Sequence, residues 1–553
     1  MTFLFIAGFL VSGLFEPNYG QSVIRGPYLQ LGTPTSVVVK WRTDQDADSR
    51  VRYGSSLSNL NESTVGSGST TEHEVALTGL SPDTKYYYAI GTSSTTLAGG
   101  DEKHFFITSP NPGTKKPTRI WILGDSGTKD EKARAVRDAY YNFTGNRHTD
   151  LWLMLGDNAY GRGEDEEYQM AVFEDMYEEM LQKSVLWPTL GNHDIKTDSS
   201  PGPFPYHDIF TLPTNGEAGG LASGTEDYYS FEYANIHFVC LNSTSTKFIK
   251  EGSAMLSWLE ADLAANNQDW TIAFWHHPAY SKGSHDSDDE GLLVRMRELA
   301  VPILEDYGID LMLSGHSHSY ERSFLIDRHY GESNTLTSDM ILDEGDGRPD
   351  GDGAYRKASL GPTPHEGSIY IVNGSSGKTS GGSLDHPIMI TSLKTLGSLV
   401  FDINDNQLDA TFIDSNGETR DYFTIIKGDL NVGPSTQMIK VSGDGQTAPV
   451  GATLPEPLVV EVQDADNKPV GGVAVTFEIT SGNGSLSERQ PRITSSNGRA
   501  SATLILGDTG GDVIVMASAS GLSGSPQTFT ATATVDNEPP APPMNVRIET
   551  SEE

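Results

Sequence analysis

The chain is poor in cysteine and in positive charge. Cys240 is the only cysteine among 553 residues, so no disulfide can form within the chain. Lysine and arginine together number 38 against 75 aspartate and glutamate residues, which gives a formal net charge of −37 at pH 7. This balance supplies no basic surface of the kind that binds nucleic acids or anionic membranes. We therefore expect neither of these as a partner.

Long apolar runs are also scarce, and the one candidate lies at the N-terminus. Residues 2–15, TFLFIAGFLVSGLF, fall short of the ~20 residues that a membrane-spanning helix requires. The run resembles the apolar core of a signal peptide, although no Lys or Arg precedes it and no Ala-x-Ala site follows. We expect residues 1–20 to be a signal segment, no span of a membrane, and a secreted or cell-surface location.

The length predicts several domains, and two regions have the pattern of β-sandwiches. Residues 21–110 contain short runs such as SVVVKWRT and TKYYYAIG between turns, which predicts about seven strands. Residues 436–536 show similar runs between Gly and Asn turns, and predict a second sandwich. Residues 537–553 are a Pro-rich linker or the start of a further module.

The central region, residues 118–428, has a different pattern, because apolar strands alternate with helical segments. We expect helices within residues 129–143, 165–181, 253–265 and 290–308. This alternation predicts βαβ units and a largely parallel sheet. Residues 228–242 and 398–427 have the pattern of antiparallel strands. Both kinds of strand fit a two-sheet α/β/β/α sandwich.

Five apolar strands of the central region end in residues that can bind metals. They are followed by GDSG (124–127), GDNAY (156–160), GNHD (191–194), HHP (276–278) and GHSH (315–318). The carboxyl ends of parallel strands meet at one edge of a sheet, so these side chains are expected to converge. Mixed Asp, Asn and His ligands suit Fe, Mn, Zn or Co better than Mg or Ca. A shared carboxylate permits two metals ~3.5–4 Å apart.

The order and spacing of these motifs resemble the calcineurin-like metallophosphoesterases. Gly127 in the first motif and Tyr160 in the second resemble the purple acid phosphatases, in which a Gly replaces a His and a Tyr is added. The segments RGPYLQ, VVVKW, VRYG and GLSPDTKYYY resemble the fibronectin-III-like domain that precedes the catalytic domain of those enzymes. Residues 436–536 look like a bacterial immunoglobulin-like domain of surface and adhesion proteins.

The resemblance implies two metal sites that share one carboxylate. Its ferric site would be formed by Asp125, Tyr160 and His318, and its divalent site (Zn, Mn or Fe) by Asn192, His276 and His316, with Asp157 as the bridge. The family pattern His-x-Pro selects His276 over His277, which is then a supporting or packing residue. A phenol has an unperturbed pKa of about 10, so a strongly polarising cation is needed to hold Tyr160 as tyrosinate in acid.

Two further histidines are candidate catalytic residues. His193 follows Asn192 and would hydrogen-bond the phosphate or protonate the leaving oxygen, and its alternative role is to orient a ligand. His285, in the loop SKGSHDSDD, would contact the substrate or is merely exposed. The resemblance implies hydrolysis of phosphate monoesters by attack of a metal-bound hydroxide, with a small-molecule phosphate ester as the partner.

Alternatives remain open at this point. The same dinuclear site could serve a phosphodiesterase, and an adhesion or anchoring protein could carry a vestigial metal domain. The immunoglobulin-like domain suggests contact with a cell surface or a polysaccharide of a bacterium. Gly-Lys-Thr in residues 373–380, NGSSGKTS, lacks the glycine spacing of a P-loop, because Val372 stands where a Gly is needed. We therefore expect no nucleotide site there.

Overall fold

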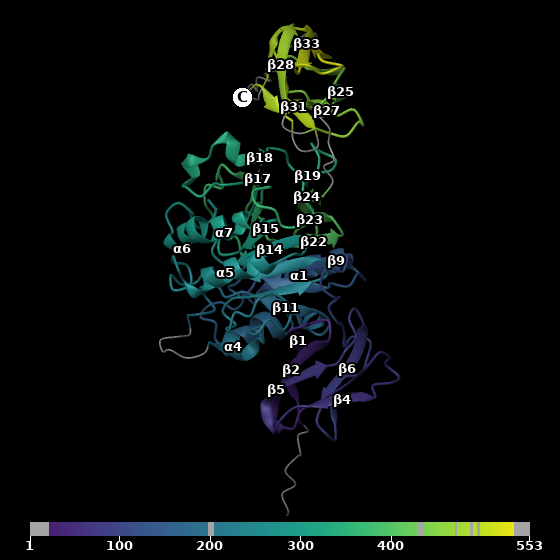
Figure 1. Cartoon of the computed structure of the whole chain (residues 1–553), viewed down its shortest axis with the longest axis vertical. Coiled ribbons are helices and arrows are strands. Elements are labelled where there is room, and N and C mark those ends of the chain that lie inside the picture. The colour runs from purple at the N-terminus through teal and green to yellow at the C-terminus, as the bar shows by residue number, and fades with distance from the viewer. Residues whose placement is uncertain are drawn as a thin grey trace, which may run out of the picture.

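The computed structural model describes residues 21–196, 204–428, 435–470, 473–486, 490–494 and 498–535. The predicted signal segment and the C-terminal Pro-rich segment lie outside these residues. Figure 1 shows three bodies in succession along the longest axis: the N-terminal strands in purple, a central α/β body, and the C-terminal strands in yellow-green. This order agrees with the predicted multidomain architecture.

The N-terminal body is a sandwich of two sheets. One sheet has the order β1 (Val23–Gln30), β2 (Ser36–Ala47), β5 (Thr70–Thr78). The other runs β4 (Glu62–Val65), β3 (Arg50–Gly54), β6 (Lys85–Gly91), β7 (Thr96–Gly99), with β8 (Phe105–Ile107) also paired to β6. Alternate residues of β5 are buried, as a half-buried strand requires. The core between the two sheets includes Val39, Trp41, Val51 and Tyr88.

Ion pairs from two arginines to one aspartate attach the sandwich to the central body. Two hydrogen bonds join the Arg25 guanidinium to the Asp165 carboxylate, at 2.9 and 3.0 Å. Arg42 donates to the same two oxygens at 2.5 and 2.8 Å. Bidentate pairing of this kind is the strongest form of an arginine–carboxylate contact, so it fixes orientation as well as position.

Two seven-stranded mixed sheets form the central body. The first has the order β11 (Val185–Pro188), β10 (Leu151–Met154), β9 (Thr118–Leu123), β22 (Gly397–Asn404), β23 (Gln407–Asp414), β24 (Thr419–Lys427), β19 (Tyr355–Lys357). The second runs β12 (Tyr229–Tyr233), β13 (Ile236–Cys240), β14 (Trp270–Trp275), β15 (Leu311–Ser314), β20 (Ile369–Asn373), β16 (Tyr320–Ser323), β21 (Met389–Leu393). Strands β9, β10 and β11 are parallel, as are β13, β14, β15 and β20.

Helices cover the outer faces of these sheets, which gives the predicted α/β/β/α layers. In β14, Ile272 and Phe274 belong to the core between the sheets, whereas Ala273 and Trp275 belong to the core under the helices. The outer helices of the second sheet are α5 (Ala254–Ala265), α6 (Gly291–Arg295), the π-helical η2 (Met296–Ala300) and α7 (Val301–Asp306). Helix α1 (Glu131–Thr144) packs on the first sheet, where Tyr140 stacks on Trp121 at 4.2 Å.

All four predicted helical segments are helical over most of their length, but one of them is interrupted. The segment 165–181 is not a single helix but α2 (Asp165–Tyr168), the π-helical η1 (Gln169–Phe173) and α3 (Glu178–Leu181). Asp175 interrupts it with a left-handed φ of 53°. Tertiary contacts therefore override the helical pattern, since Asp165 binds the sandwich and Ala171, Val172 and Phe173 are buried.

The C-terminal body is a second sandwich. Its strands are β25 (Gln437–Ser442), β27 (Leu458–Gln463) and β31 (Arg499–Ala502) in one sheet, β26 (Gln446–Pro449), β34 (Gln527–Thr534), β33 (Gly511–Ser518), β28 (Ala474–Ser481) and β30 (Arg492–Ile493) in another, and the pair β29 (Gly484–Leu486) and β32 (Leu504–Leu506). Its core includes Val460, Phe477, Val515 and Phe529.

The remaining short elements of the central body are α4 (Pro205–Ile209), the 3₁₀ turns η3 (Ser333–Thr335) and η4 (Ser338–Met340), and the strand pair β17 (Leu325–Ile326) and β18 (Ile341–Asp343). In the part of the chain that the structure describes, no helix combines the length and the apolar character needed to cross a membrane.

Candidate metal centre

The strand ends singled out in the sequence meet at one place. Asp125 follows β9, Asp157 follows β10, His276 follows β14 and His316 follows β15. The loops are joined by backbone hydrogen bonds, from Asp125 N to the Gly156 carbonyl at 3.2 Å and from Gly315 N to the His276 carbonyl at 3.0 Å. The two sheets therefore contribute ligand-bearing loops to a common edge.

The backbone at this edge is strained. Asp125, Asp157 and His316 have φ values of 55°, 51° and 66°, in the left-handed region that costs a non-glycine residue free energy. Such strain is tolerated where side chains must be held in a functional arrangement. Gly156 permits the close approach of the His276 ring, because a Cβ on Gly156 would lie 2.6 Å from His276 Nδ1.

A first cluster contains Tyr160, Asp125 and His318. The Tyr160 hydroxyl donates to Asp125 Oδ1 at 2.8 Å and lies 3.3 Å from His318 Nε2. His318 Nε2 is 3.4 Å from the same carboxylate oxygen. Gly127 lets the tyrosine loop approach, because a Cβ on Gly127 would lie 2.5 Å from the carbonyl carbon of Asn158. This packing is the structural counterpart of the Gly and Tyr signature in the sequence.

A second cluster surrounds His276 Nε2. That nitrogen lies 3.1 Å from Asn192 Oδ1, 3.3 Å from Asp157 Oδ1 and 3.2 Å from His316 Nδ1. His276 Nδ1 donates to the carbonyl of Leu155 at 2.8 Å, which directs Nε2 toward the other three atoms. Burial opposes a charged ring, but Asp157 and Asp125 raise the pKa of His276. Two oxygens and two ring nitrogens thus face one another, an arrangement that a shared proton or a metal cation accommodates.

The two clusters are contiguous. Ligand atoms of Asp125, Asp157 and His276 all lie within 4.8 Å of one another. The seven predicted ligands are thereby brought together.

Electrostatics around Tyr160 also fit a cation. Burial raises the pKa of Tyr160 far above its usual value, and Asp125 and Asp157 raise it further. The protein alone therefore keeps this phenol protonated, and a phenolate requires a strongly polarising ion. Burial lowers the pKa of His316 to about 4, with His276 adding to the effect and Glu290 opposing it, so its ring is neutral and able to bind metal.

Further residues hold the ligands in place, and the sequence did not single them out. Ser380 Oγ lies 2.8 Å from His318 Nδ1, so the opposite nitrogen of that ring faces Asp125. Asp194 accepts hydrogen bonds from Gly191 N at 2.8 Å and from the Tyr168 hydroxyl at 2.7 Å. Burial, with Asp157 adding to it, raises the pKa of Asp194 to about 7. Metal ligands commonly have such outer partners.

The histidines outside the ligand set occupy three different positions. His277 is buried and its Nδ1 lies 2.9 Å from Ser243 Oγ, which is a packing position. His193 lies beside Tyr160 with 4.4 Å between ring centroids, and its Nε2 is 3.9 Å from Asp157 Oδ2. His285 stacks on His316 at 3.7 Å.

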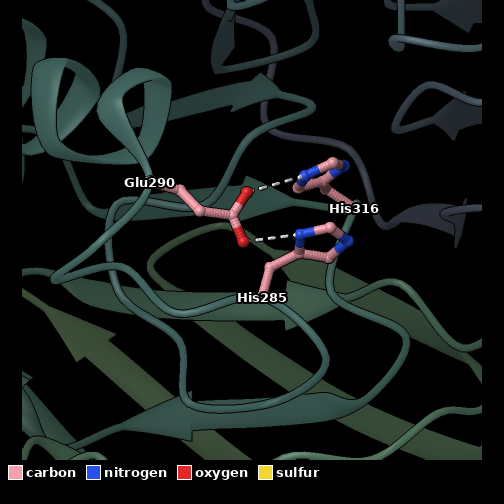
Figure 2. Close-up of side chains that lie close together, drawn as sticks. All are labelled: His285, Glu290 and His316. Carbon is pink, nitrogen blue, oxygen red and sulfur yellow. Dashed lines mark hydrogen bonds and ion pairs between the residues drawn. The ribbon is translucent and has the colours of Figure 1, made fainter.

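Glu290 connects two of these rings, as Figure 2 shows. One carboxylate oxygen is 2.7 Å from His285 Nδ1, and the other is 3.7 Å from His316 Nε2. The His316 and His285 rings lower the pKa of Glu290 to about 2, against burial, so the carboxylate is ionised. The sequence holds one signal for Glu290: it is an acidic residue directly before a helix and five residues after the loop histidine His285.

Family models match a part of each of the three bodies. The family model of calcineurin-like phosphoesterases matches residues 118–320, that of the purple acid phosphatase N-terminal domain matches 24–108, and that of the bacterial Ig-like domain (group 1) matches 453–547.

Two curated relatives are plant proteins. Purple acid phosphatase 15 of Arabidopsis thaliana is 31% identical over 278 residues, 45% of this chain and 49% of that protein. Purple acid phosphatase 1 of Ipomoea batatas is 29% identical over 312 residues, 52% of this chain and 61% of that protein. The chain thus matches about half of the first and three-fifths of the second.

A solved structure shares the fold. The purple acid phosphatase from yellow lupin seeds superposes with a TM-score of 0.58 at 17% identity, and the match covers 74% of this chain and 75% of that one.

Proposed function

We propose that this chain, which joins a calcineurin-like phosphoesterase domain to the N-terminal domain of purple acid phosphatases, hydrolyses phosphate monoesters at a dinuclear metal centre. The observation that carries the proposal is the contiguity of two ligand clusters, with Asp125, Asp157 and His276 offering atoms within 4.8 Å of one another. The cluster with Tyr160 suits Fe(III), and the cluster with Asn192 suits a divalent Zn, Mn or Fe.

Each cluster residue has a defined task in this proposal. Asp125, Tyr160 and His318 would hold the ferric ion, Asn192, His276 and His316 the divalent ion, and Asp157 both. Two bound cations supply a hydroxide nucleophile and offset negative charge at phosphorus. Tyr160 would bind the ion as the phenolate, after loss of its hydroxyl proton. Ser380 holds His318 Nδ1, so His318 Nε2 is the nitrogen directed toward Asp125 and available to the same ion.

The outer histidines would handle the substrate. His193 Nδ1 is hydrogen-bonded to the Gly161 carbonyl at 2.8 Å, which fixes the ring beside Tyr160. His285 is fixed through Nδ1 by Glu290, so its Nε2 is the nitrogen left for a phosphate oxygen or a leaving oxygen. From this position the His285 ring can donate a proton to the departing alkoxide. His193 Nε2 accepts from the Lys196 ammonium at 2.9 Å, so His193 would orient that ammonium toward the phosphate instead of donating a proton itself.

The location and the C-terminal domain extend the proposal. The enzyme would act outside the cytoplasm of a bacterium, with its Ig-like domain contacting the cell surface or a polysaccharide. Cell fractionation of a producing bacterium tests this, and recovery of the protein in the cytoplasm alone would contradict it.

Metal analysis, a visible spectrum and a rate comparison test the activity. The expected protein contains iron and a second metal, shows a tyrosinate-to-iron absorption band, and hydrolyses phenyl phosphate faster than bis(phenyl) phosphate. The opposite order of rates would indicate a phosphodiesterase. An iron-loaded protein without turnover on either ester would favour an adhesion or anchoring role.

A further inference from the structure

A lysine lies directly beside the candidate ferric cluster. The Lys378 ammonium is 4.1 Å from the centroid of the Tyr160 ring. Lys378 belongs to the loop 373–380, whose Ser380 hydrogen-bonds the ligand His318 at 2.8 Å. The Gly-Lys-Thr segment that failed as a nucleotide-binding motif therefore lies next to the metal centre, and its lysine is half-buried there.

A second lysine lies at the same edge. The Lys196 ammonium is 2.9 Å from His193 Nε2, and the His193 ring is 4.4 Å from that of Tyr160. Lys378 contacts Tyr160 and Lys196 contacts its neighbour His193, so both ammonium groups lie beside the same pair of rings.

Among the residues that the structure describes, no carboxylate forms an ion pair with Lys196 or Lys378, although the chain has 75 acidic residues against 38 basic ones. Lys282, in the loop that carries His285, shows the ordinary situation, because its ammonium binds Asp286 at 2.6 Å and Asp288 at 2.8 Å.

Another side chain at the centre has the reverse charge. Glu290 presents a carboxylate to His285 and His316, whereas Asp286 and Asp288 of the same loop are ion-paired with Lys282. An elongated anion held at the centre is therefore favoured with its additional negative charge toward the lysines and away from Glu290. Bound cations would repel Lys196 and Lys378, and a second anionic group between them would offset that repulsion.

We infer that Lys196 and Lys378 form an anion subsite beside the metal centre, and that the preferred substrates are phosphate monoesters whose leaving group carries a second phosphate or carboxylate. The inference rests on the proposed function, since the metal centre must hold the phosphoryl group that is cleaved. The second phosphate or carboxylate of the substrate takes no part in the bond cleavage, so it contributes to binding alone.

Binding of phosphonates, which are not hydrolysed, tests the subsite without turnover. Affinities of methylphosphonate and methylenediphosphonate are measured by calorimetry on the metal-loaded full chain, with metal content checked in every variant. Lys378→Ala and Lys196→Ala should each weaken methylenediphosphonate by about threefold to fivefold relative to methylphosphonate. Lys103→Ala, an exposed lysine of the N-terminal sandwich, should change neither affinity. Equal losses for both ligands, or no loss, would overturn the subsite.

A matched pair of esters identifies the leaving-group contribution. The KM for 4-carboxyphenyl phosphate should rise about threefold to fivefold in Lys378→Ala relative to the KM for phenyl phosphate, and the difference should shrink in high salt. Methylenediphosphonate tests a second phosphate and the carboxyphenyl ester a second carboxylate. If the protein hydrolyses phenyl phosphate but prefers neither ligand with a second anion, the subsite is refuted and the hydrolase activity stands. If it hydrolyses no ester but still binds methylenediphosphonate more tightly than methylphosphonate, hydrolysis is refuted and the subsite stands.

Discussion

The Tyr160 hydroxyl donates a hydrogen bond to Asp125 Oδ1 at 2.8 Å, within a pair of buried carboxylates that raise the pKa of the phenol. In the proposed function, the proton on this hydroxyl and the ferric ion would compete for the same oxygen. Binding of the ion would then depend on how readily the phenol is deprotonated, which would couple metal loading to pH.

Replacement of Tyr160 by Phe separates the two roles of this hydroxyl. We expect Tyr160→Phe to lose the visible absorption band and most of the iron, because the phenolate ligand is absent. The metal-free protein should be destabilised by only about 1 kcal/mol, since one hydrogen bond is lost. Iron content, the spectrum and urea unfolding of metal-free protein provide the measurements. A variant that kept the band would rule Tyr160 out as its source.

Removal of the charge on Glu290 should affect catalysis more than folding. Glu290→Gln weakens the orientation of His285 and His316, and we expect a fall in kcat of about 10- to 100-fold. Asp289→Asn, at an exposed neighbouring position, is the matched control and should leave kcat unchanged. Steady-state rates on phenyl phosphate at equal metal content decide the matter, and equal rates for the two variants would show that Glu290 has no orienting role.

Loss of the Ser380 hydroxyl should appear in metal affinity. His318 Nδ1 is held by Ser380 Oγ at 2.8 Å, so Ser380→Ala frees the ring to rotate. Metal titration of the stripped protein should show about 10-fold weaker binding of one of the two ions. Ser383→Ala, whose hydroxyl bonds the nearby Asp385 on the surface, serves as the control. Unchanged affinity for both ions would show that the hydrogen bond does not tune the site.

Stability should depend on pH through Glu305, which lies away from the metal ligands. Burial raises the pKa of Glu305 from 4.5 to about 7, with hydrogen bonds from the hydroxyls of Tyr330 and Tyr370 opposing this and Asp327 adding to it. The folded protein therefore keeps a proton between these pH values that the unfolded chain releases. The free energy of unfolding should fall by roughly 2–3 kcal/mol as the pH rises across this interval.

Variants at two glutamates test the assignment. Glu305→Gln should remove one share of the pH dependence of unfolding, and Asp194, whose pKa is also raised to about 7, keeps another. The exposed Glu332→Gln should leave the whole dependence in place. Urea unfolding of metal-free protein at pH 5 and pH 7 gives the comparison. An identical slope in Glu305→Gln would assign the dependence to another group.

The amino-acid pattern predicted much of this architecture because several site residues directly follow recognisable strands. Asp125, Asp157 and His316 each follow an apolar strand and a glycine, so their common edge follows from a parallel sheet. Ser380 and Lys378 lie in a loop that only the tertiary fold brings to that edge, and no local spacing indicates them; for Glu290 the one local signal is its place five residues after His285 and directly before a helix. The interruption of the segment 165–181 was missed for a similar reason, because its acidic helical pattern does not report the contact with the N-terminal sandwich.

The break in that segment has a mechanical consequence. Asp165 is gripped by Arg25 and Arg42 of the sandwich, and two residues later Glu167 accepts hydrogen bonds from the amides of Gly161 and Arg162 at 2.7 and 2.8 Å. A single short turn thus ties the first domain to the peptide that follows Tyr160. The N-terminal sandwich serves as a brace for the tyrosine loop, and a catalytic fragment trimmed at the domain border would lose that support.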